Sequence, residues 1–298
     1  MGSLRDLRDR IGSVKSTRKI TSAMKMVAAS KLKKAQDQAE ASQPYADSMS
    51  DMIGRVASNV ISSDSVPPLL IGTGREDVHL FIVVTSDRGL CGGFNSNLVR
   101  KVQKQIEHLE AEGKKVKVVC AGRKGHDILK RVMEDKILER FINLSSGNKI
   151  AYSEADNIAQ FVLDAFDAGE FDVCTVVYNE FQSVLVQKPV FQKLIPFELP
   201  KNDNDETKAA EGPVSPYEYE PDEETILGKL LPKNIGVQIF RALLDSAAGE
   251  QAARMTAMDN ATRNAGDMID DLTLQYNRER QATITNELIE IISGAEAL

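Results

Sequence analysis

The sequence contains no tryptophan, few aromatic residues and only three cysteines, and each shortage narrows the class of protein. Aromatic residues make up 5% of the 298 residues, a composition typical of proteins whose core consists mainly of helix–helix contacts. The cysteines are odd in number and form no C-x-x-C pair, which argues against a disulfide framework and a zinc knuckle. A reducing compartment is therefore expected.

The sequence also lacks any run of about 18 apolar residues, so we expect no segment that spans a membrane. The basic, amphipathic start MGSLRDLRDRIGSVKS is similar in composition to a mitochondrial transit peptide. Transit peptides avoid acids, however, and this segment contains Asp6 and Asp9. We interpret it as part of a mature helix, and any association with a membrane is expected to depend on partner proteins.

Both ends of the chain have the apolar periodicity of long helices. Proline is absent before Pro44 and after Pro232, and apolar side chains recur every three or four positions in both segments. The positions are Leu4, Leu7, Ile11, Val14, Thr21, Met24, Ala28, Leu32 and Ala35, and then Met255, Met258, Thr262, Ala265, Ile269, Leu272 and Tyr276. Residues 1–60 hold eleven Lys or Arg against six Asp or Glu, and residues 233–298 hold six against ten. Opposite charges favour pairing of the two helices as a coiled coil.

The stretch RKITSAMKMVAASKLKKA, residues 18–35, carries six cations and no acid. Three-and-four spacing places one apolar stripe on Ile20, Met24, Val27, Ala28 and Ala35. A second apolar set, which points elsewhere, consists of Ala23, Met26 and Ala29. A helix with two apolar faces among lysines is expected to meet a surface that the chain itself does not supply.

Nucleic acid is an alternative partner for this basic segment. Eight cations lie from Arg10 to Lys34, and no acid lies between Asp9 and Asp37. The whole chain is acidic, with a net charge of −7, and the basic segment has no aromatic residue for base stacking. A solvated coiled-coil face would explain the lysines but not the additional Met and Ala residues, so a protein partner is favoured and no nucleic-acid binding is expected.

Between the long helices, short β-rich runs alternate with amphipathic helical segments. We expect strands at 79–86, 115–121, 171–181 and 183–197, and helices at 97–113, 126–133 and 153–169. Ser153 is the expected N-cap of the last helix. The alternation predicts a three-layer, Rossmann-like α/β domain inserted between the two halves of the coiled coil, and the acidic segment 201–216 is expected to be a loop.

The stretch VVTSDRGLCGGFN could be a phosphate site, because a strand runs into a glycine-rich turn that precedes a helix. Neither G-x-x-x-x-G-K-[ST] nor G-x-G-x-x-G is present, since Gly89, Gly92 and Gly93 are followed by Phe94 and Asn95. A structural turn is therefore favoured over a nucleotide site.

Cys91 in the same stretch is a candidate nucleophile, which would need a histidine beside it. The three histidines of the chain are His79, His108 and His126. Their positions show no ligand or triad spacing, so catalysis by Cys91 is not favoured.

Four blocks of the sequence together resemble the gamma subunit of the F-type, proton-translocating ATP synthase. They are KITSAMKMVAASK, TSDRGLCGGFN, YEYEPD, and EQAARMTAMDNAT with YNRERQATITNELIEI. The resemblance implies a central rotor shaft that couples proton flow through the membrane sector to ATP synthesis on the beta subunits. It further implies an antiparallel coiled coil of the terminal helices inside a ring of three alpha and three beta subunits, with the α/β domain at its foot. The foot would contact the epsilon subunit and the ring of c subunits.

The resemblance also implies roles for particular residues. Met24 and Lys25 would face the acidic loop of the catalytic beta subunit. The same coupling region would include Arg254, Gln281, Thr285 and Glu287. The segment that meets the c ring and epsilon would include Tyr217, Tyr219 and Glu220. The loop at 201–216 lacks a cysteine pair, so the thiol switch of the chloroplast branch is not expected.

The domain division that follows is a coiled-coil helix at 1–60, an α/β domain at 75–200, an acidic loop and foot segment at 201–222, and a second coiled-coil helix at 223–298. The implied chain is a non-catalytic subunit without a cofactor of its own, peripheral on the cytoplasmic face of the bacterial inner membrane. Two other hypotheses remain open. A nucleotide-binding α/β enzyme would use Gly89 to Gly93, and a coiled-coil scaffold with an inserted α/β domain would self-associate through its terminal helices.

Overall fold

The computed structural model describes residues 4–60, 67–144, 149–197 and 223–296. The chain forms two compact units, one of residues 1–30 with 254–298 and the other of residues 31–253. Two long helices, α1 (Leu4–Val60) and α6 (Glu223–Glu296), contribute to both units. We call the first unit the coil unit and the second the sheet unit. The domain division expected from the sequence stays a prediction.

All other elements belong to the sheet unit. They are α2 (Pro68–Ile71), β1 (Val78–Val84), α3 (Phe94–Ala111), β2 (Lys115–Ala121), α4 (Arg123–Met133), a 3-10 turn (Glu134–Lys136), β3 (Ile137–Phe141), α5 (Tyr152–Asp167), β4 (Val173–Phe181) and β5 (Gln187–Ile195).

In the coil unit, α1 and α6 run antiparallel. Arg8 donates to the hydroxyl of Tyr276 at 3.2 Å, and Lys25 pairs with Asp259 at 2.5 Å, so the partner number falls as the number along α1 rises. The buried apolar side chains of the unit keep the three-and-four spacing of the sequence. They are Leu7, Ala28, Met258, Ala265, Ile269 and Leu272. The antiparallel coiled coil is thus confirmed.

The expected stripe within residues 18–35 is wrong in two positions. Ile20 and Val27 are 59% and 56% exposed, whereas Thr21 and Ala28 are buried. The contact seam between the two helices repeats every seven residues along α1, and Thr21 and Ala28 lie on it. Ile20 and Val27 are one position out of phase with the seam, so they point away from α6.

The sheet of the sheet unit has the strand order β3-β2-β1-β4-β5. β3, β2, β1 and β4 are parallel, and β5 pairs antiparallel with β4 at the edge. The order reverses direction between β1 and β4, because β2 and β3 extend to one side and β4 and β5 to the other. This is the doubly wound arrangement that alternating strands and helices predict.

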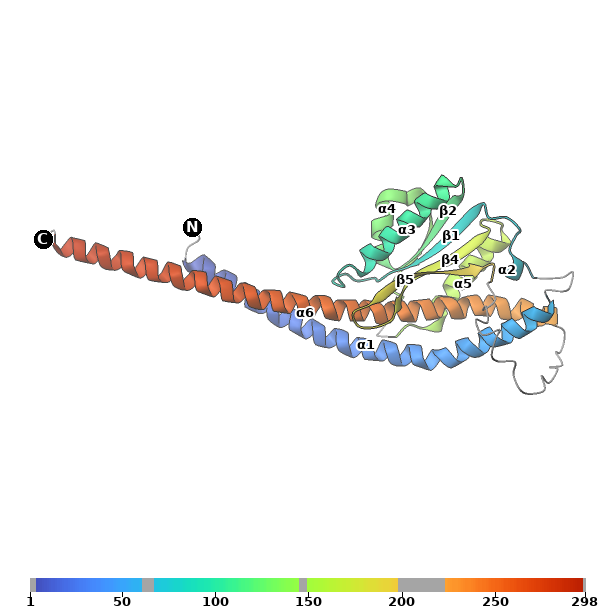
Figure 1. Ribbon diagram of the computed structural model, residues 1–298, viewed down its shortest axis with the longest axis horizontal. Helices are drawn as coiled ribbons and strands as arrows, with labels where there is room; N and C mark the ends of the chain where they lie inside the picture. The colour runs from blue at the N-terminus through green and yellow to red at the C-terminus, as the bar shows by residue number, and fades with distance from the viewer. Residues whose placement is uncertain (1–3, 61–66, 145–148, 198–222, 297–298) are drawn as a thin grey trace, which may run out of the picture. The chain divides into compact units, whose positions relative to one another are not determined.

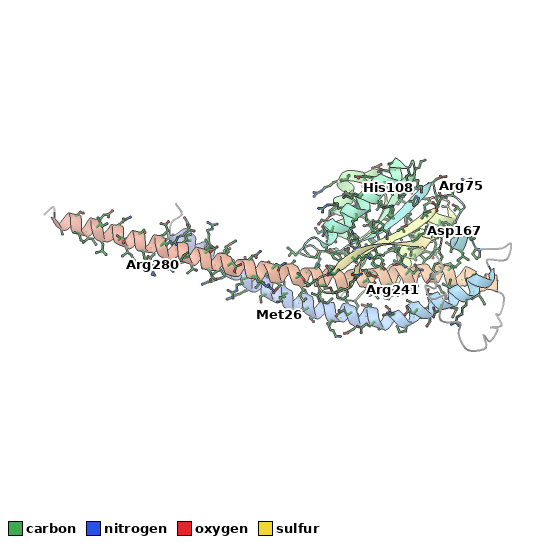
Figure 2. The ribbon with its side chains drawn as sticks, in the orientation of Figure 1. Met26, Arg75, His108, Asp167, Arg241 and Arg280 are labelled. Carbon is green, nitrogen blue, oxygen red and sulfur yellow. The ribbon has the colours of Figure 1, made fainter. Side chains whose placement is uncertain are left out.

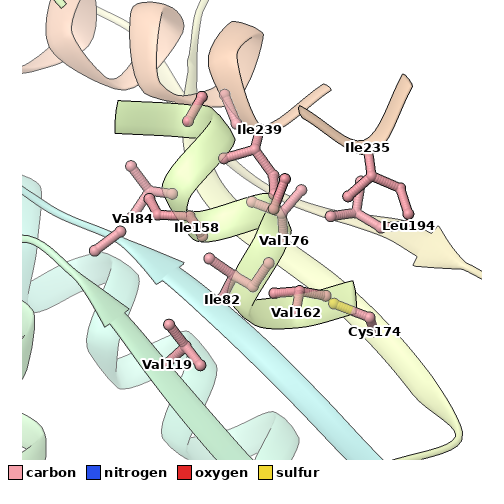
Figure 3. Close-up of a cluster of buried hydrophobic side chains, with 14 of the residues drawn as sticks. Ile82, Val84, Val119, Ile158, Val162, Cys174, Val176, Leu194, Ile235 and Ile239 are labelled. Atoms are coloured by element: carbon pink, nitrogen blue, oxygen red, sulfur yellow. The ribbon is translucent and has the colours of Figure 1, made fainter. Parts of the chain in front are cut away.

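Helices cover both faces of this sheet (Figure 1). α3 and α4 pack on one face, in a buried cluster that includes Phe81, Leu98 and Leu129. α5 and part of α6 pack on the other, where Ile158 of α5 and Ile239 of α6 meet the strands (Figure 3). The three layers and the Rossmann-like sheet agree with the sequence-based expectation.

Two details of the sheet unit differ from that expectation. β3, Ile137–Phe141, was not predicted, because only its first and last side chains are partly buried and a strand of five residues gives a weak alternation. Ser153 is not an N-cap: α5 begins at Tyr152 after Ala151, and no side chain caps it. The ring of Tyr152 instead packs edge-on against Phe240 of α6, with centroids 5.6 Å apart, so a tertiary contact accompanies the start of this helix.

Asp245 is a half-buried carboxylate on the part of α6 that lies in the sheet unit. Its pKa is raised to about 6, chiefly by burial; Arg241 opposes this change, and repulsion from Glu180 contributes to it. The folded state therefore holds a proton on this carboxyl more tightly than the unfolded chain does. This group consequently destabilises the fold increasingly as the pH rises from about 4 through about 6.

We expect Asp245→Asn to raise the melting temperature at pH 7.5 by several degrees and to raise it much less at pH 5.0, because the neutral amide removes the cost of a buried charge. Thermal unfolding of the purified chain followed by circular dichroism measures both values. Asp167→Asn, at the exposed end of α5 (Figure 2), is the control and should give the same shift at both pH values. An equal gain for Asp245→Asn at both pH values would contradict the proposed cause.

Candidate partner-binding surface

The glycine-rich turn after β1 caps a helix of its own chain. The first three backbone N–H groups of α4, at residues 123–125, donate to three consecutive residues, 85–87. The contacts are Arg123 N to Asp87 Oδ1 at 3.0 Å, Lys124 N to the Ser86 carbonyl at 3.0 Å, and Gly125 N to Thr85 Oγ1 at 2.9 Å. The first N–H groups of a helix lack partners within the helix and are its usual anion-binding groups. In α4, these N–H groups already donate hydrogen bonds to Thr85, Ser86 and Asp87 of the turn.

Two glycines allow this close approach. Gly122 has a φ of 116°, and a Cβ there would lie 2.1 Å from the carbonyl oxygen of Thr85. A Cβ at Gly125 would lie 2.7 Å from the Thr85 hydroxyl. The β2–α4 turn therefore needs glycine in order to pack on the β1 turn.

The crevice where the strand order reverses is filled by side chains of the chain. In doubly wound sheets, ligands bind beyond the carboxyl ends of the strands at this point. Here Asn95 is buried and its amide bonds Ser86 and Cys91, at 2.7 Å to Ser86 Oγ and 3.3 Å to Cys91 Sγ. Asn179 of β4 donates to the carbonyl of Phe94 at 3.2 Å. These contacts give the turn, including Cys91, a structural role.

α6 covers the same region from the other side. A Cβ at Gly249 would lie 3.1 Å from the ring of Phe94 and 3.6 Å from the carbonyl oxygen of Asn179. The helix therefore passes close to the end of the crevice. Among the residues that the structure describes, no group of His, Cys, Asp or Glu side chains could hold a metal ion.

The coil unit contains several of the residues that the resemblance assigns to the beta subunit. Met24 and Lys25 are half-buried. The Lys25 ammonium forms an ion pair with Asp259, which also binds Arg263. The hydrogen bond from Lys25 is the main cause that lowers the pKa of Asp259. Sequence reasoning missed this pair, because it joins residues that are far apart along the chain.

The other assigned residues of the coupling region lie on α6, where Gln281 and Thr285 are one helical turn apart. Gln281, Thr285 and Glu287 are exposed on the last turns of α6, and Arg254 is half-buried where α6 enters the coil unit. In Figure 2 the side chains around Arg280 project from α6 into solvent. The remaining assigned positions, Tyr217, Tyr219 and Glu220, lie outside the described residues.

Exposed apolar side chains are the clearest binding feature of the coil unit. We call them the exposed apolar surface: Ile20, Met26, Val27, Met268, Leu274, Ile284, Leu288, Ile289, Ile291 and Ile292. Met26 is 66% exposed and Ile291 69%. Exposed large apolar side chains in this number suit contacts with another protein. Met26 was expected on a second apolar face, whereas Ile20 and Val27 were expected on the main stripe. The run of apolar residues after 283 was the signal for the exposed residues near the end of α6.

A sequence profile for the family described as ATP synthase matches residues 3–298. The chain is 56% identical over 303 residues to the ATP synthase gamma chain of Rhodospirillum rubrum, and the alignment covers all of both chains. The chain belongs to the ATP synthase gamma-chain family. A second gamma chain, from Sinorhizobium medicae, is 54% identical over 298 residues, again with full coverage of both chains.

Solved structures agree with membership of the gamma-chain family. A chain of the central stalk and c-ring of Tetrahymena thermophila mitochondrial ATP synthase superposes with a TM-score of 0.60 at 27% identity, covering 81% of this chain and 99% of that one. A chain of the Euglena gracilis mitochondrial ATP synthase rotor has a TM-score of 0.62 at 21% identity, covering 94% and 98%, and shows the shared fold. In the part of this chain that the structure describes, no helix is long and apolar enough to cross a membrane.

We expect Asp87→Ala to destabilise the chain by about 1 kcal/mol, since a helix loses its side-chain cap, and Asp87→Asn to cost much less, because the amide oxygen still accepts from Arg123 N–H. Urea unfolding of the purified chain gives both values. Neither variant should alter the response of the chain to added ATP in a calorimetric titration. ATP binding by the wild-type chain alone would instead support the phosphate-site hypothesis at Gly89 to Gly93.

We expect Lys25→Gln and Asp259→Asn to lower the melting temperature by similar small amounts, and the double variant to lower it by less than their sum. Both single changes remove the same ion pair, and double-variant cycles isolate such coupling. The coupling should weaken between 0.05 M and 0.5 M NaCl, since salt screens exposed charges. Strict additivity at low salt would mean that the pair does not form in solution.

Proposed function

We propose that the chain is the central rotor shaft of an F-type ATP synthase, and that it couples proton flow through the membrane sector to ATP synthesis on the beta subunits. The observation that carries this is the full-length identity of 56% with a gamma chain. The likeness to a chain of a solved central stalk and c-ring supports it. As a rotor subunit, the chain works with the alpha and beta subunits, the epsilon subunit and the c ring.

We infer that the chain is itself non-catalytic. The filled crevice between β1 and β4 supports this, because Asn95 and Phe94 occupy the place where doubly wound sheets bind nucleotide. The α4 N-terminus supports it as well, since its first donors bind the TSD segment. Nucleotide chemistry would then take place on the beta subunits, and this chain would present different faces to them in turn.

We propose that the beta-facing surface of the shaft comprises Met24, Lys25, Arg254 and the exposed residues near the end of α6. Gln281 and Thr285 suit such a role, because their side chains are exposed in the described structure and can meet a partner without rearranging the coil unit. The Lys25 ammonium has three N–H donors, and Asp259 accepts one of them, so the same ammonium has donors left for a second carboxylate. An acidic loop of a beta subunit would then approach a cation that is already held in place.

The remaining contacts are proposed on the family resemblance. Tyr217, Tyr219 and Glu220 would meet the c ring and epsilon. The synthase would lie on the cytoplasmic face of a bacterial inner membrane with this chain as a peripheral subunit, a proposal supported by the bacterial sources of its relatives. The scaffold alternative has no observation in its favour, because the relatives over the full length are gamma chains.

We expect the combined change Gln281→Ala and Thr285→Val to lower ATP-driven proton pumping in membranes several-fold while leaving assembly and the melting temperature of the chain unchanged. Both side chains are exposed, so their loss affects only contacts with partners. Lys101→Ala, equally exposed on α3, is the matched control and should leave pumping at the wild-type level. Normal pumping by a fully assembled double variant would show that these two residues do not belong to the coupling surface.

A further inference from the structure

The strand β5 lies at the edge of the sheet, and one of its sides is open (Figure 1). It pairs with β4 alone, and no other strand of the described chain joins its outer side. An open cavity of about 400 Å³ lies against β5, between α1 and α6, and we call it the edge groove. All the residues that line it belong to the sheet unit. An unpaired strand edge beside a groove is an arrangement that binds extended peptides.

The pairing of β5 with β4 decides which backbone groups point outward. Pairs in an antiparallel ladder alternate between those that exchange hydrogen bonds and those whose N–H and C=O groups point away from each other. The hydrogen bond from Gln182 N–H to the Val186 carbonyl, at 3.3 Å, sets the phase at the hairpin. It places Gln187, Pro189 and Phe191 of β5 in pairs of the second kind. Pro189 agrees with this phase, because proline has no N–H to donate to β4.

The backbone of Phe191 therefore presents an N–H donor and a C=O acceptor to the edge groove. Its ring lies on the other face of the sheet, edge-on to the ring of Phe81 with centroids 6.3 Å apart, so the groove meets Phe191 through its backbone. No hydrogen bond joins these two backbone groups to another segment of the described chain. The next side chain, Gln192, turns to α6 instead and donates to Gln238 at 3.0 Å.

The opposite wall of the edge groove contains a buried donor without an acceptor. Asn234 of α6 lines the groove and is 2% exposed, and its Nδ2 forms no hydrogen bond within the described structure. Buried side-chain amides almost always form hydrogen bonds, because an unpaired N–H in a low-dielectric site costs free energy. An extended peptide has C=O groups along both of its edges. A peptide in the groove could therefore bond β5 with one edge and Asn234 with the other.

Arg241 of α6, labelled in Figure 2, gives the edge groove a cation. Its Nη1 lies 3.9 Å from Asp47 of α1, too far for a hydrogen bond, and the two side chains are 52% and 57% exposed. Asp245 also attracts this guanidinium. A guanidinium has five N–H donors, however, and bonds carboxylates in a two-pronged geometry. An acidic side chain on the α6 side of a bound peptide would suit this group.

We propose that an extended peptide segment of a partner protein, with alternating apolar and acidic side chains, adds to this sheet antiparallel to β5. The peptide residue opposite Phe191 would exchange backbone hydrogen bonds with it and pack an apolar side chain on its ring, which is 38% exposed. The adjacent residue would direct its carboxylate to Arg241, and its carbonyl would accept from Asn234. The inference goes beyond the rotor function and does not depend on it.

The test measures binding of an acetylated hexapeptide of alternating Val and Glu to the purified full-length chain by isothermal titration calorimetry. N-methylation of the three Val nitrogens removes the donors that would face β5, whereas N-methylation of the three Glu nitrogens removes those on the other edge. We expect the first change to weaken binding at least tenfold, and the second, which is the matched control, to weaken it much less. A hexapeptide of alternating Val and Lys should bind at least tenfold more weakly than the Glu peptide.

Variants of the chain then test the two side chains of α6. Asn234→Leu should weaken binding of the Val and Glu hexapeptide at least fivefold. Arg241→Gln should weaken binding of the same peptide, but not of a hexapeptide of alternating Val and Gln, because only the carboxylates need the guanidinium. Arg131→Gln, exposed on α4, is the control and should leave both affinities unchanged. Thermal unfolding followed by circular dichroism checks that each variant folds.

Equal weakening by both N-methylated peptides would overturn the proposal, as would an absence of binding by the wild-type chain. Binding that appears only after deletion of residues 201–216 would assign the edge groove to that segment of the chain itself. A dimer in sedimentation experiments that the Val and Glu hexapeptide dissociates would assign the groove to a second copy of the chain. Either of these two results would also overturn the proposal.

Discussion

Burial of one face of α6 is the interaction on which both units of this chain depend. In the sheet unit, Ile235 and Ile239 complete the core on one side of the sheet, together with Ile158 of α5. In the coil unit, Ile269 and Leu272 of the same helix are buried at coiled-coil spacing. The sheet therefore cannot bury that side of its core without the C-terminal helix. One helix thus contributes buried residues to both units.

The turn after β1 forms hydrogen bonds within the chain at the place where a doubly wound sheet commonly binds a ligand. The order reversal between β1 and β4 makes the crevice that commonly binds nucleotides. Thr85, Ser86 and Asp87 use the N-terminal donors of α4, and Asn95 joins the turn to its own helix. The helix N-terminal N–H groups, which bind phosphate in other proteins, here connect the turn after β1 to the turn between β2 and α4.

The coil unit combines a fixed interior with an adaptable exterior. The buried seam and the half-buried ion pair of Lys25 and Asp259 hold the two helices in register. Outside, the exposed apolar surface consists of aliphatic side chains and methionine, without a single aromatic ring. Flexible aliphatic groups can pack against unlike surfaces in succession, whereas large rigid rings would favour one fixed geometry. Such a surface fits a shaft that turns within a ring of partner subunits.

The sequence by itself determined the periodic features. Three-and-four spacing predicted the two long helices and their seam, β-rich runs predicted four of the five strands, and four sequence blocks indicated the family. These signals are local or repeat along the chain, so they can be read without coordinates. The phase of Ile20 and Val27, by contrast, depends on which residues of α6 face α1.

Only the tertiary structure decided the features that depend on distant residues. Tyr152 begins α5 in contact with Phe240, Asp87 caps a helix that starts 36 residues later, and Asn234 lines a cavity with β5. The local sequence predicted Ser153 as the N-cap of α5, which is wrong, and gave only a weak signal for the edge strand β3. Packing and hydrogen bonding between segments outweigh such weak local preferences, because each buried contact or buried unpaired group contributes as much free energy as the propensities of several residues.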